Sequence, residues 1–72
     1  MTHSEAMSFI LDNFEVRGKQ VQFEKNIFLI VDFKITSDNN ENFNPHAVLK
    51  YKSERVIYFN LPLEDAFKLI ID

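Results

Sequence analysis

The stretch Ile27–Ile35 constrains the fold most, because it is the longest apolar run in a chain of 72 residues. It reads IFLIVDFKI. Every odd-numbered position is hydrophobic, whereas the even-numbered positions mix apolar and charged residues. Alternation with a period of two and many β-branched residues are typical of a strand with one buried face. The pattern therefore predicts a central strand whose odd-numbered residues face the core.

The segment before it, Phe14–Glu24, also alternates, but its apolar positions change from even to odd at Gly18, the only glycine in the chain. A β-bulge inserts one extra residue into a strand and produces this change of parity. We therefore predict one bulged strand over Phe14–Glu24. A turn at Gly18 is the alternative.

The connection between these two strands sets their register. A three-residue loop, Glu24–Asn26, pairs Phe23 with Ile27 and places apolar residues opposite apolar residues. A two-residue loop would instead place Glu24 on the predicted core face. The sequence therefore favours the longer loop.

A polar connection, Thr36–Pro45, is rich in Asn and Asp, and we expect it to be a long loop and a candidate binding segment. Two short strands follow, His46–Lys52 and Arg55–Asn60, with odd-numbered residues facing the core. A loop centred on Ser53–Arg55 would join them. The predicted pairs across this hairpin are Leu49 with Phe59 and Tyr51 with Ile57.

Helices are predicted at both ends of the chain. Thr2 and Glu5 have the spacing of a capping box before a helix over His3–Asn13. Pro62 suits the first position of a second helix, Pro62–Ile71. The predicted buried stripes are Met7, Ile10, Leu11 and Phe14 in the first helix, and Leu63, Ala66, Phe67, Ile70 and Ile71 in the second.

We therefore predict that residues 1–72 form one α+β domain: an N-terminal helix, a four-stranded antiparallel meander sheet and a C-terminal helix. Two helices with one apolar stripe each need one shared sheet face, which predicts a two-layer sandwich. The order of elements resembles that of double-stranded-RNA-binding domains. Those domains carry lysines at the start of the last helix, where this chain reads Pro62-Leu63-Glu64-Asp65, so we do not expect RNA binding.

Composition restricts the function. The chain has no cysteine and a net charge of −3, which excludes disulfides and thiolate chemistry and disfavours duplex-DNA binding. The two histidines are not linked to a Ser or Thr nucleophile by any recognisable spacing, and no glycine-rich loop is present. We therefore expect no enzymatic activity, cofactor, metal site or membrane association, and a cytoplasmic location. Frequent Phe, Ile, Asn and Lys suggest an AT-rich genome, such as that of a bacterium or its phage.

The even-numbered sheet face provides the functional hypothesis. If both helices cover the odd-numbered face, the opposite face exposes more apolar residues than an open antiparallel sheet usually does. We predict that this face binds a protein partner or a second copy of the chain, as in a small inhibitor or adaptor of phage or mobile-element type. The candidate interface residues are Phe28, Ile30, Val48, Val56, Tyr58 and Lys50.

Two other interpretations fit the same residues of this face. Single-stranded nucleic acid could stack on Phe28 and Tyr58 while Lys34, Lys50 and Lys52 contact phosphates, although the acidic net charge opposes this. Alternatively, one helix covers the face, or the patch is ordinary surface.

Overall fold

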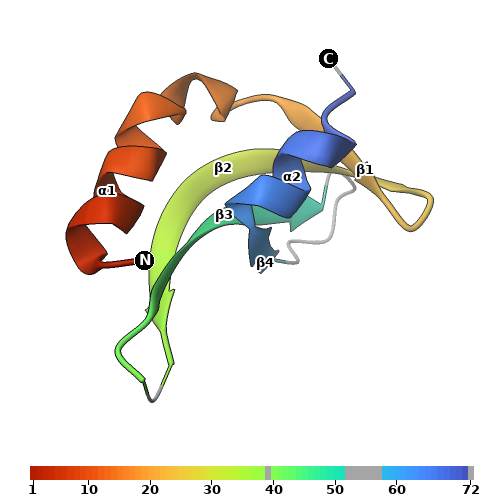
Figure 1. Ribbon diagram of the computed structural model, residues 1–72. Helices are drawn as coiled ribbons and strands as arrows, with labels where there is room; N and C mark the ends of the chain where they lie inside the picture. Colours follow the sequence, from red (N-terminus) through yellow and green to blue (C-terminus); the bar gives the residue numbers. More distant parts are fainter. Residues whose placement is uncertain (39, 52–57, 72) are drawn as a thin grey trace.

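The computed structural model describes residues 1–38, 40–51 and 58–71 (Figure 1). It confirms the predicted order of a helix, four antiparallel strands and a helix. The elements are α1 (His3–Asp12), the 3₁₀ turn η1 (Phe14–Val16), β1 (Gln20–Phe23), β2 (Asn26–Ser37), β3 (Phe43–Tyr51), β4 (Tyr58–Pro62) and α2 (Leu63–Leu69).

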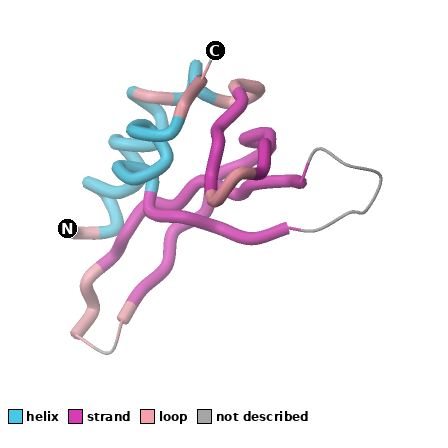
Figure 2. Tube along the Cα trace, turned by 90° about the vertical axis from the view of Figure 1, so that its right-hand side faces the viewer, coloured by secondary structure: helices cyan, strands magenta, loops and turns pink. Residues whose placement is uncertain are grey.

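The strands form one curled sheet in the order β1-β2-β3-β4, as a meander requires. Both helices pack against the same face of this sheet (Figure 2). The largest fully buried side chains come from both layers: Val21, Ile30 and Leu49 from the sheet and Leu63 from α2. Phe9 of α1 and Phe67 of α2 lie 5.9 Å apart between ring centroids, so the helices also contact each other.

Helix α1 begins with the predicted capping box. Glu5 N–H donates to the Thr2 hydroxyl at 3.1 Å, and Thr2 N–H donates to Glu5 Oε1 at 2.8 Å. The predicted buried stripe is wrong for three of its four residues, because Ala6 and Ile10 of α1 face the core and Phe14 lies beyond the helix, in η1. This orientation also brings Phe9 against Phe67 of α2. It leaves exposed the residues Met7, Leu11 and Phe14.

The predicted bulged strand over Phe14–Glu24 is wrong in its first half, and the alternative of a turn at Gly18 is correct. Phe14–Val16 is a 3₁₀ turn, and Lys19 N–H donates to Val16 C=O at 3.0 Å. Gly18 has a φ of 93°, which a type II turn requires and which favours glycine. Gly18 N–H then donates to Ile30 C=O, and Ile30 N–H donates to Lys19 C=O. Gly18 and Lys19 therefore both lie opposite the single residue Ile30, which is the arrangement of a β-bulge directly after the turn.

The predicted three-residue loop between β1 and β2 is also wrong. The connection has two residues, Glu24 and Lys25, with φ values of 50° and 72°. Positive φ at both positions is the requirement of a type I′ turn. Phe23 therefore pairs with Asn26, and Val21 pairs with Phe28. Because Asn or Gly usually marks such a turn, the residues Glu and Lys gave no signal of it.

The decisive departure from the prediction is a bulge inside β2. Ile30 pairs with Leu49 and Asp32 pairs with Val48, so Val31 is an extra residue on β2. An extra residue reverses which parity faces the core. Before Val31 the even-numbered residues Phe28 and Ile30 are buried. After Val31 the odd-numbered residues Phe33 and Ile35 pack against the core.

The β2–β3 hairpin is longer than predicted and extends beyond the helices (Figure 2). Thr36 and Ser37 belong to β2, and residues 43–45 belong to β3, so half of the predicted loop Thr36–Pro45 is strand. Asp38 Oδ1 accepts the N–H groups of Asn40 at 2.9 Å and Asn42 at 3.1 Å, which orders the described part of the turn.

The remaining elements are close to their predicted positions. The predicted pair of Leu49 with Phe59 is confirmed, whereas Ile57, the partner predicted for Tyr51, lies outside the described residues. Pro62 precedes α2 as its N-cap, and the helix ends at Leu69 rather than Ile71. Ile70 then forms a bridge to Val21, and Ile71 N–H donates to Gln20 C=O at 3.0 Å. The C-terminal segment therefore covers the outer edge of β1.

Candidate interaction surface

The side of the sheet away from both helices carries a mixed row of side chains across three strands. Leu29 of β2 pairs with Lys50 of β3, and Lys50 pairs with Tyr58 of β4. Cross-strand partners share one face of a sheet, so these three side chains are neighbours. Ile27 and Val48 flank the row on the same face. We call this surface the outer face: Ile27, Leu29, Val48, Lys50 and Tyr58.

Exposure is uneven across the outer face. Tyr58 is 56% exposed and Ile27 is 37% exposed. Leu29, Val48 and Lys50 are half-buried by their neighbours in the sheet. Polar residues surround this centre: Gln20 and Gln22 on β1, Asp32 on β2 and Asn60 on β4. An apolar centre with a polar rim is the usual anatomy of a protein interface.

The structure divides the predicted interface residues into three groups. Val48, Lys50 and Tyr58 lie on the outer face. Phe28 and Ile30 do not, because they are 7% and 0% exposed in the core, so their predicted place on an open face is wrong. The bulge at Val31 causes this error, since it reverses the parity of β2. Val56 lies outside the described residues.

Sequence reasoning missed Ile27 and Leu29, which replace Phe28 and Ile30 on the outer face. The segment 27–30 is apolar at every position, so its pattern fits either parity. One signal was available in β1. With a two-residue turn after Phe23, Val21 pairs with Phe28, and both residues are apolar.

An open hollow of about 290 Å³ lies beside Leu29, where β1 gives way to the turn at Gly18. Leu29 and Val31 form part of its wall, together with Arg17. The Arg17 side chain is fixed there because its Nε donates to Val31 C=O at 2.9 Å. Its guanidinium also lies 5.9 Å from the centre of the Phe14 ring. The hollow offers a shallow recess for one apolar side chain at the margin of the outer face.

A second apolar surface runs along α1 and continues into η1. Met7, Leu11 and Phe14 are 42%, 64% and 48% exposed, and we call them the α1 stripe. Met7 and Leu11 have the spacing i, i+4 on one flank of α1, and Phe14 follows in η1. Phe14 contacts Phe33 of β2 with 5.4 Å between ring centroids, so the stripe ends at the edge of the sheet.

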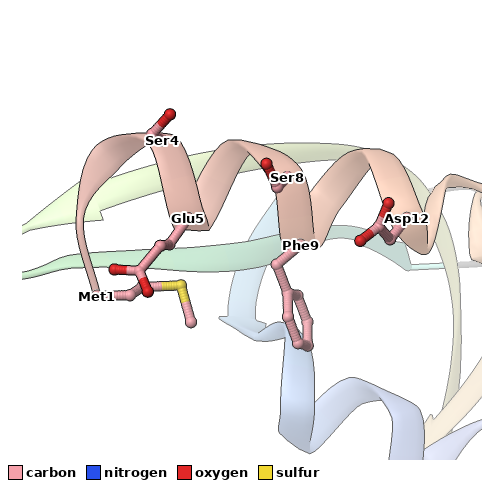
Figure 3. Close-up of a pocket in the computed structure, with 6 residues that line it drawn as sticks. All are labelled: Met1, Ser4, Glu5, Ser8, Phe9 and Asp12. Atoms are coloured by element: carbon pink, nitrogen blue, oxygen red, sulfur yellow. The ribbon is translucent and has the colours of Figure 1, made fainter.

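A second open hollow, about 390 Å³, lies along the exposed side of α1 (Figure 3). Figure 3 shows the Ser4 and Ser8 side chains pointing away from the sheet and Phe9 pointing towards α2. Glu5 is already engaged in the capping box, where its hydrogen bonds to Thr2 hold the pKa of the carboxyl below its usual value. The residues that line this hollow include no histidine or lysine that could act as a base for either serine.

The histidines lie apart from these serines. The His3 ring meets Phe43 edge-on, with 5.3 Å between centroids. His46 lies on β3 between Lys34 and Pro62, and its Nδ1 is buried without a hydrogen-bond partner in the described part of the chain. Among residues 1–38, 40–51 and 58–71, no group of three or more His, Asp or Glu side chains could hold a metal ion.

No helix in the described ranges is long and apolar enough to cross a membrane. The sequence matches no protein-family model, and comparison with curated proteins and with solved structures finds no match.

Proposed function

We propose that this protein is a small, non-enzymatic interaction module that binds a protein partner through the outer face of its sheet. The observation that carries the proposal is the row Leu29, Lys50 and Tyr58, which spans three strands on the side that neither helix covers. Lys50 at the centre of an apolar patch favours a partner that presents apolar side chains around a carboxylate. An inhibitor or adaptor of phage or mobile-element type would fit this chemistry.

Residue type favours the outer face over the α1 stripe. Tyr58 belongs to the residue types that contribute most energy to interfaces, and the hollow beside Leu29 provides a place for an anchoring side chain. The α1 stripe offers more exposed apolar surface but contains no Tyr, Trp or Arg. Because both surfaces are apolar, the test must separate them.

The nucleic-acid alternative loses one of its two stacking residues. Phe28 is 7% exposed, and its ring packs on Phe59 at 4.7 Å and on Tyr51 at 5.2 Å between centroids. It therefore has no free ring face for a base. Tyr58 and the lysines Lys34 and Lys50 remain, whereas Lys52 lies outside the described residues. One exposed aromatic residue is a poor platform for consecutive bases.

The test is a quantitative pull-down from a lysate of the source organism, with the wild-type protein and three variants that remain folded by circular dichroism. Tyr58→Asp should abolish capture of any partner that wild type retains. Ser4→Asp, which adds the same charge on α1, away from the outer face, should change capture little. Loss of the partner with Leu11→Asp but not with Tyr58→Asp would contradict the proposal and assign binding to the α1 stripe.

A separate measurement tests the nucleic-acid alternative. A fluorescently labelled single-stranded oligonucleotide should show no binding at low salt. Binding that weakens with rising salt and with Lys50→Glu would overturn the proposed function in favour of nucleic-acid recognition.

A further inference from the structure

The second half of β2 has an unpaired edge. β1 and its turn accompany β2 only as far as Ile30. β2 continues to Ser37, and beyond the bulge only β3 pairs with it among the described strands. Figure 1 shows this lower part of β2 bordered by β3 on one side. An unpaired strand edge is a template for another strand.

The upper end of this edge is already capped. Phe33 N–H donates to the carboxylate of the preceding residue, Asp32, at 2.8 Å. Val31 C=O accepts from Arg17 Nε at 2.9 Å. A strand added at residues 31–33 would have to displace these two side chains.

The lower end of the edge is open. Pro45, which opposes Ile35, has no N–H, and Phe43, which opposes Ser37, donates its N–H to Met1 C=O at 2.9 Å, away from β2. In an antiparallel ladder such positions are the pairs that do not exchange hydrogen bonds. The N–H and C=O groups of Ile35 and Ser37 therefore point away from β3, towards the free edge.

We propose that a second copy of this chain occupies the edge, with the two β2 strands antiparallel about a two-fold axis at Thr36. In this register Ile35 pairs with the partner's Ser37, and the symmetric pair completes four backbone hydrogen bonds. Thr36 lies opposite the partner's Thr36. Lys34 lies opposite the partner's Asp38, so each copy contributes one cation and one anion. Opposite charges and paired threonines are favourable across strands.

The neighbouring registers are unfavourable. An axis at Lys34 places the two lysines directly opposite each other, which is repulsive. An axis at Ile35 requires the capped N–H of Phe33 and places Asp32 opposite the partner's Asp38. The charge pattern and the cap therefore favour the axis at Thr36 over both of these registers.

This pairing is independent of the proposed function, because it uses the strand edge rather than the outer face. A two-fold axis normal to the sheet would join the two sheets into one with eight strands. Both outer faces would then lie on the same side. The dimer would present two copies of the proposed binding surface to a partner, which raises avidity without new contacts.

A single-cysteine variant tests the register directly, because the chain has no cysteine. Residues opposite each other in a pair that exchanges no hydrogen bonds have Cα atoms about 4.5 Å apart, which suits a disulfide. With a diamide oxidant, Thr36→Cys should form a covalent dimer about tenfold faster than Asn44→Cys. Asn44 of β3 pairs with Thr36 on the side of β2 away from the free edge. In the dimer, the two Asn44 residues would therefore be three strand spacings apart. Equal rates for the two variants would overturn the proposal.

Sedimentation equilibrium at rising protein concentration provides the second test. Ser37→Pro removes an edge N–H that donates to no residue in the described part of the chain, so this variant should stay folded and be monomeric at concentrations where wild type dimerises. Lys34→Glu should raise the dimer Kd about tenfold, whereas Lys25→Glu, with the same charge change at the β1–β2 turn, should leave it unchanged. A wild-type protein that is monomeric throughout, or a Ser37→Pro variant that dimerises as wild type does, would contradict the proposal. Partner capture by the outer face would remain testable in either case.

Discussion

The two halves of β2 have the same strand geometry but opposite relations to the rest of the molecule. Before Val31, the strand is paired on both sides and its even-numbered residues are buried. After Val31, it is paired on one side and its odd-numbered residues face the core. One extra residue thus decides which side chains belong to the core. It also marks the end of the pairing with β1, so the first half contributes the outer face and the second half contributes the free edge.

Deletion of Val31 should have the largest effect on this arrangement. Without the extra residue, one half of β2 must turn its apolar residues outward and its polar residues, such as Asp32 and Lys34, inward. Each large apolar side chain exposed costs about 2 kcal/mol, so most of the stability of so small a domain would be lost. Circular dichroism with urea unfolding should show no cooperative transition. A cooperative transition near the wild-type midpoint would mean that the parity change is not needed.

Gly18→Ala should have an intermediate effect, because it perturbs the point at which β1 stops accompanying β2. The φ of 93° is strained for any residue with a Cβ, and a Cβ built there meets no atom within 4 Å. The cost is therefore one of backbone conformation alone, about 1–2 kcal/mol. Urea unfolding measures it. Gly18→Asn is the matched control, because asparagine tolerates a positive φ better than alanine and should therefore cost less. A Gly18→Ala variant as stable as wild type would show that the turn does not need a positive φ.

The smallest effects should come from the capping box of α1, which packs over β2 and β3. Thr2→Ala should lower the free energy of unfolding by about 1 kcal/mol. The hydrogen bonds from Thr2 lower the pKa of Glu5 from its usual 4.5, so the ionised form stabilises the fold. This contribution is present above pH 4.5 and disappears as the pH falls through the lowered pKa.

The pH dependence can be isolated by a matched variant. Glu5→Gln retains a side-chain oxygen that can accept the Thr2 N–H but carries no charge. The stability difference between wild type and Glu5→Gln should therefore shrink as the pH is lowered from 7 to 3 in thermal unfolding experiments. A difference that is constant over this range would contradict the role of the Glu5 charge.

The parts of the fold that follow from local signals were predictable from the sequence. The capping box at Thr2 and Glu5, the alternation of β3 and the pair of Leu49 with Phe59 are all confirmed. In each case the residue types favour one local structure, and any other would leave a polar group buried or an apolar side chain exposed. The order of elements and the shared helical face follow from these signals.

The wrong predictions concern positions where the sequence fits two arrangements equally well. Positions 27–30 are all apolar, so neither parity is penalised until Asp32 and Lys34 are reached. The assumption of one unbroken strand then placed Phe28 and Ile30 on the open face. It also forced the three-residue loop before β2. One missed bulge thus produced both the register error and the misassigned half of the predicted interface.

Helix α1 was ambiguous for a similar reason. It carries apolar residues over a wider arc than one sheet face can bury, so its rotation depends on the contact of Phe9 with Phe67 of α2. That contact joins distant parts of the chain and has no local signal. The outer face was therefore predictable for Val48, Lys50 and Tyr58, while the exposure of the α1 stripe was not.

The central claim is that Ile30 belongs to the core and Leu29 to the outer face, and two alanine variants test it most directly. Ile30→Ala should lower the free energy of unfolding in urea by about 2–5 kcal/mol, because Ile30 is 0% exposed. Leu29→Ala should lower it by less than about 1.5 kcal/mol, because Leu29 is only half-buried. A larger loss for Leu29→Ala than for Ile30→Ala would contradict the bulge at Val31 and the outer face built on it.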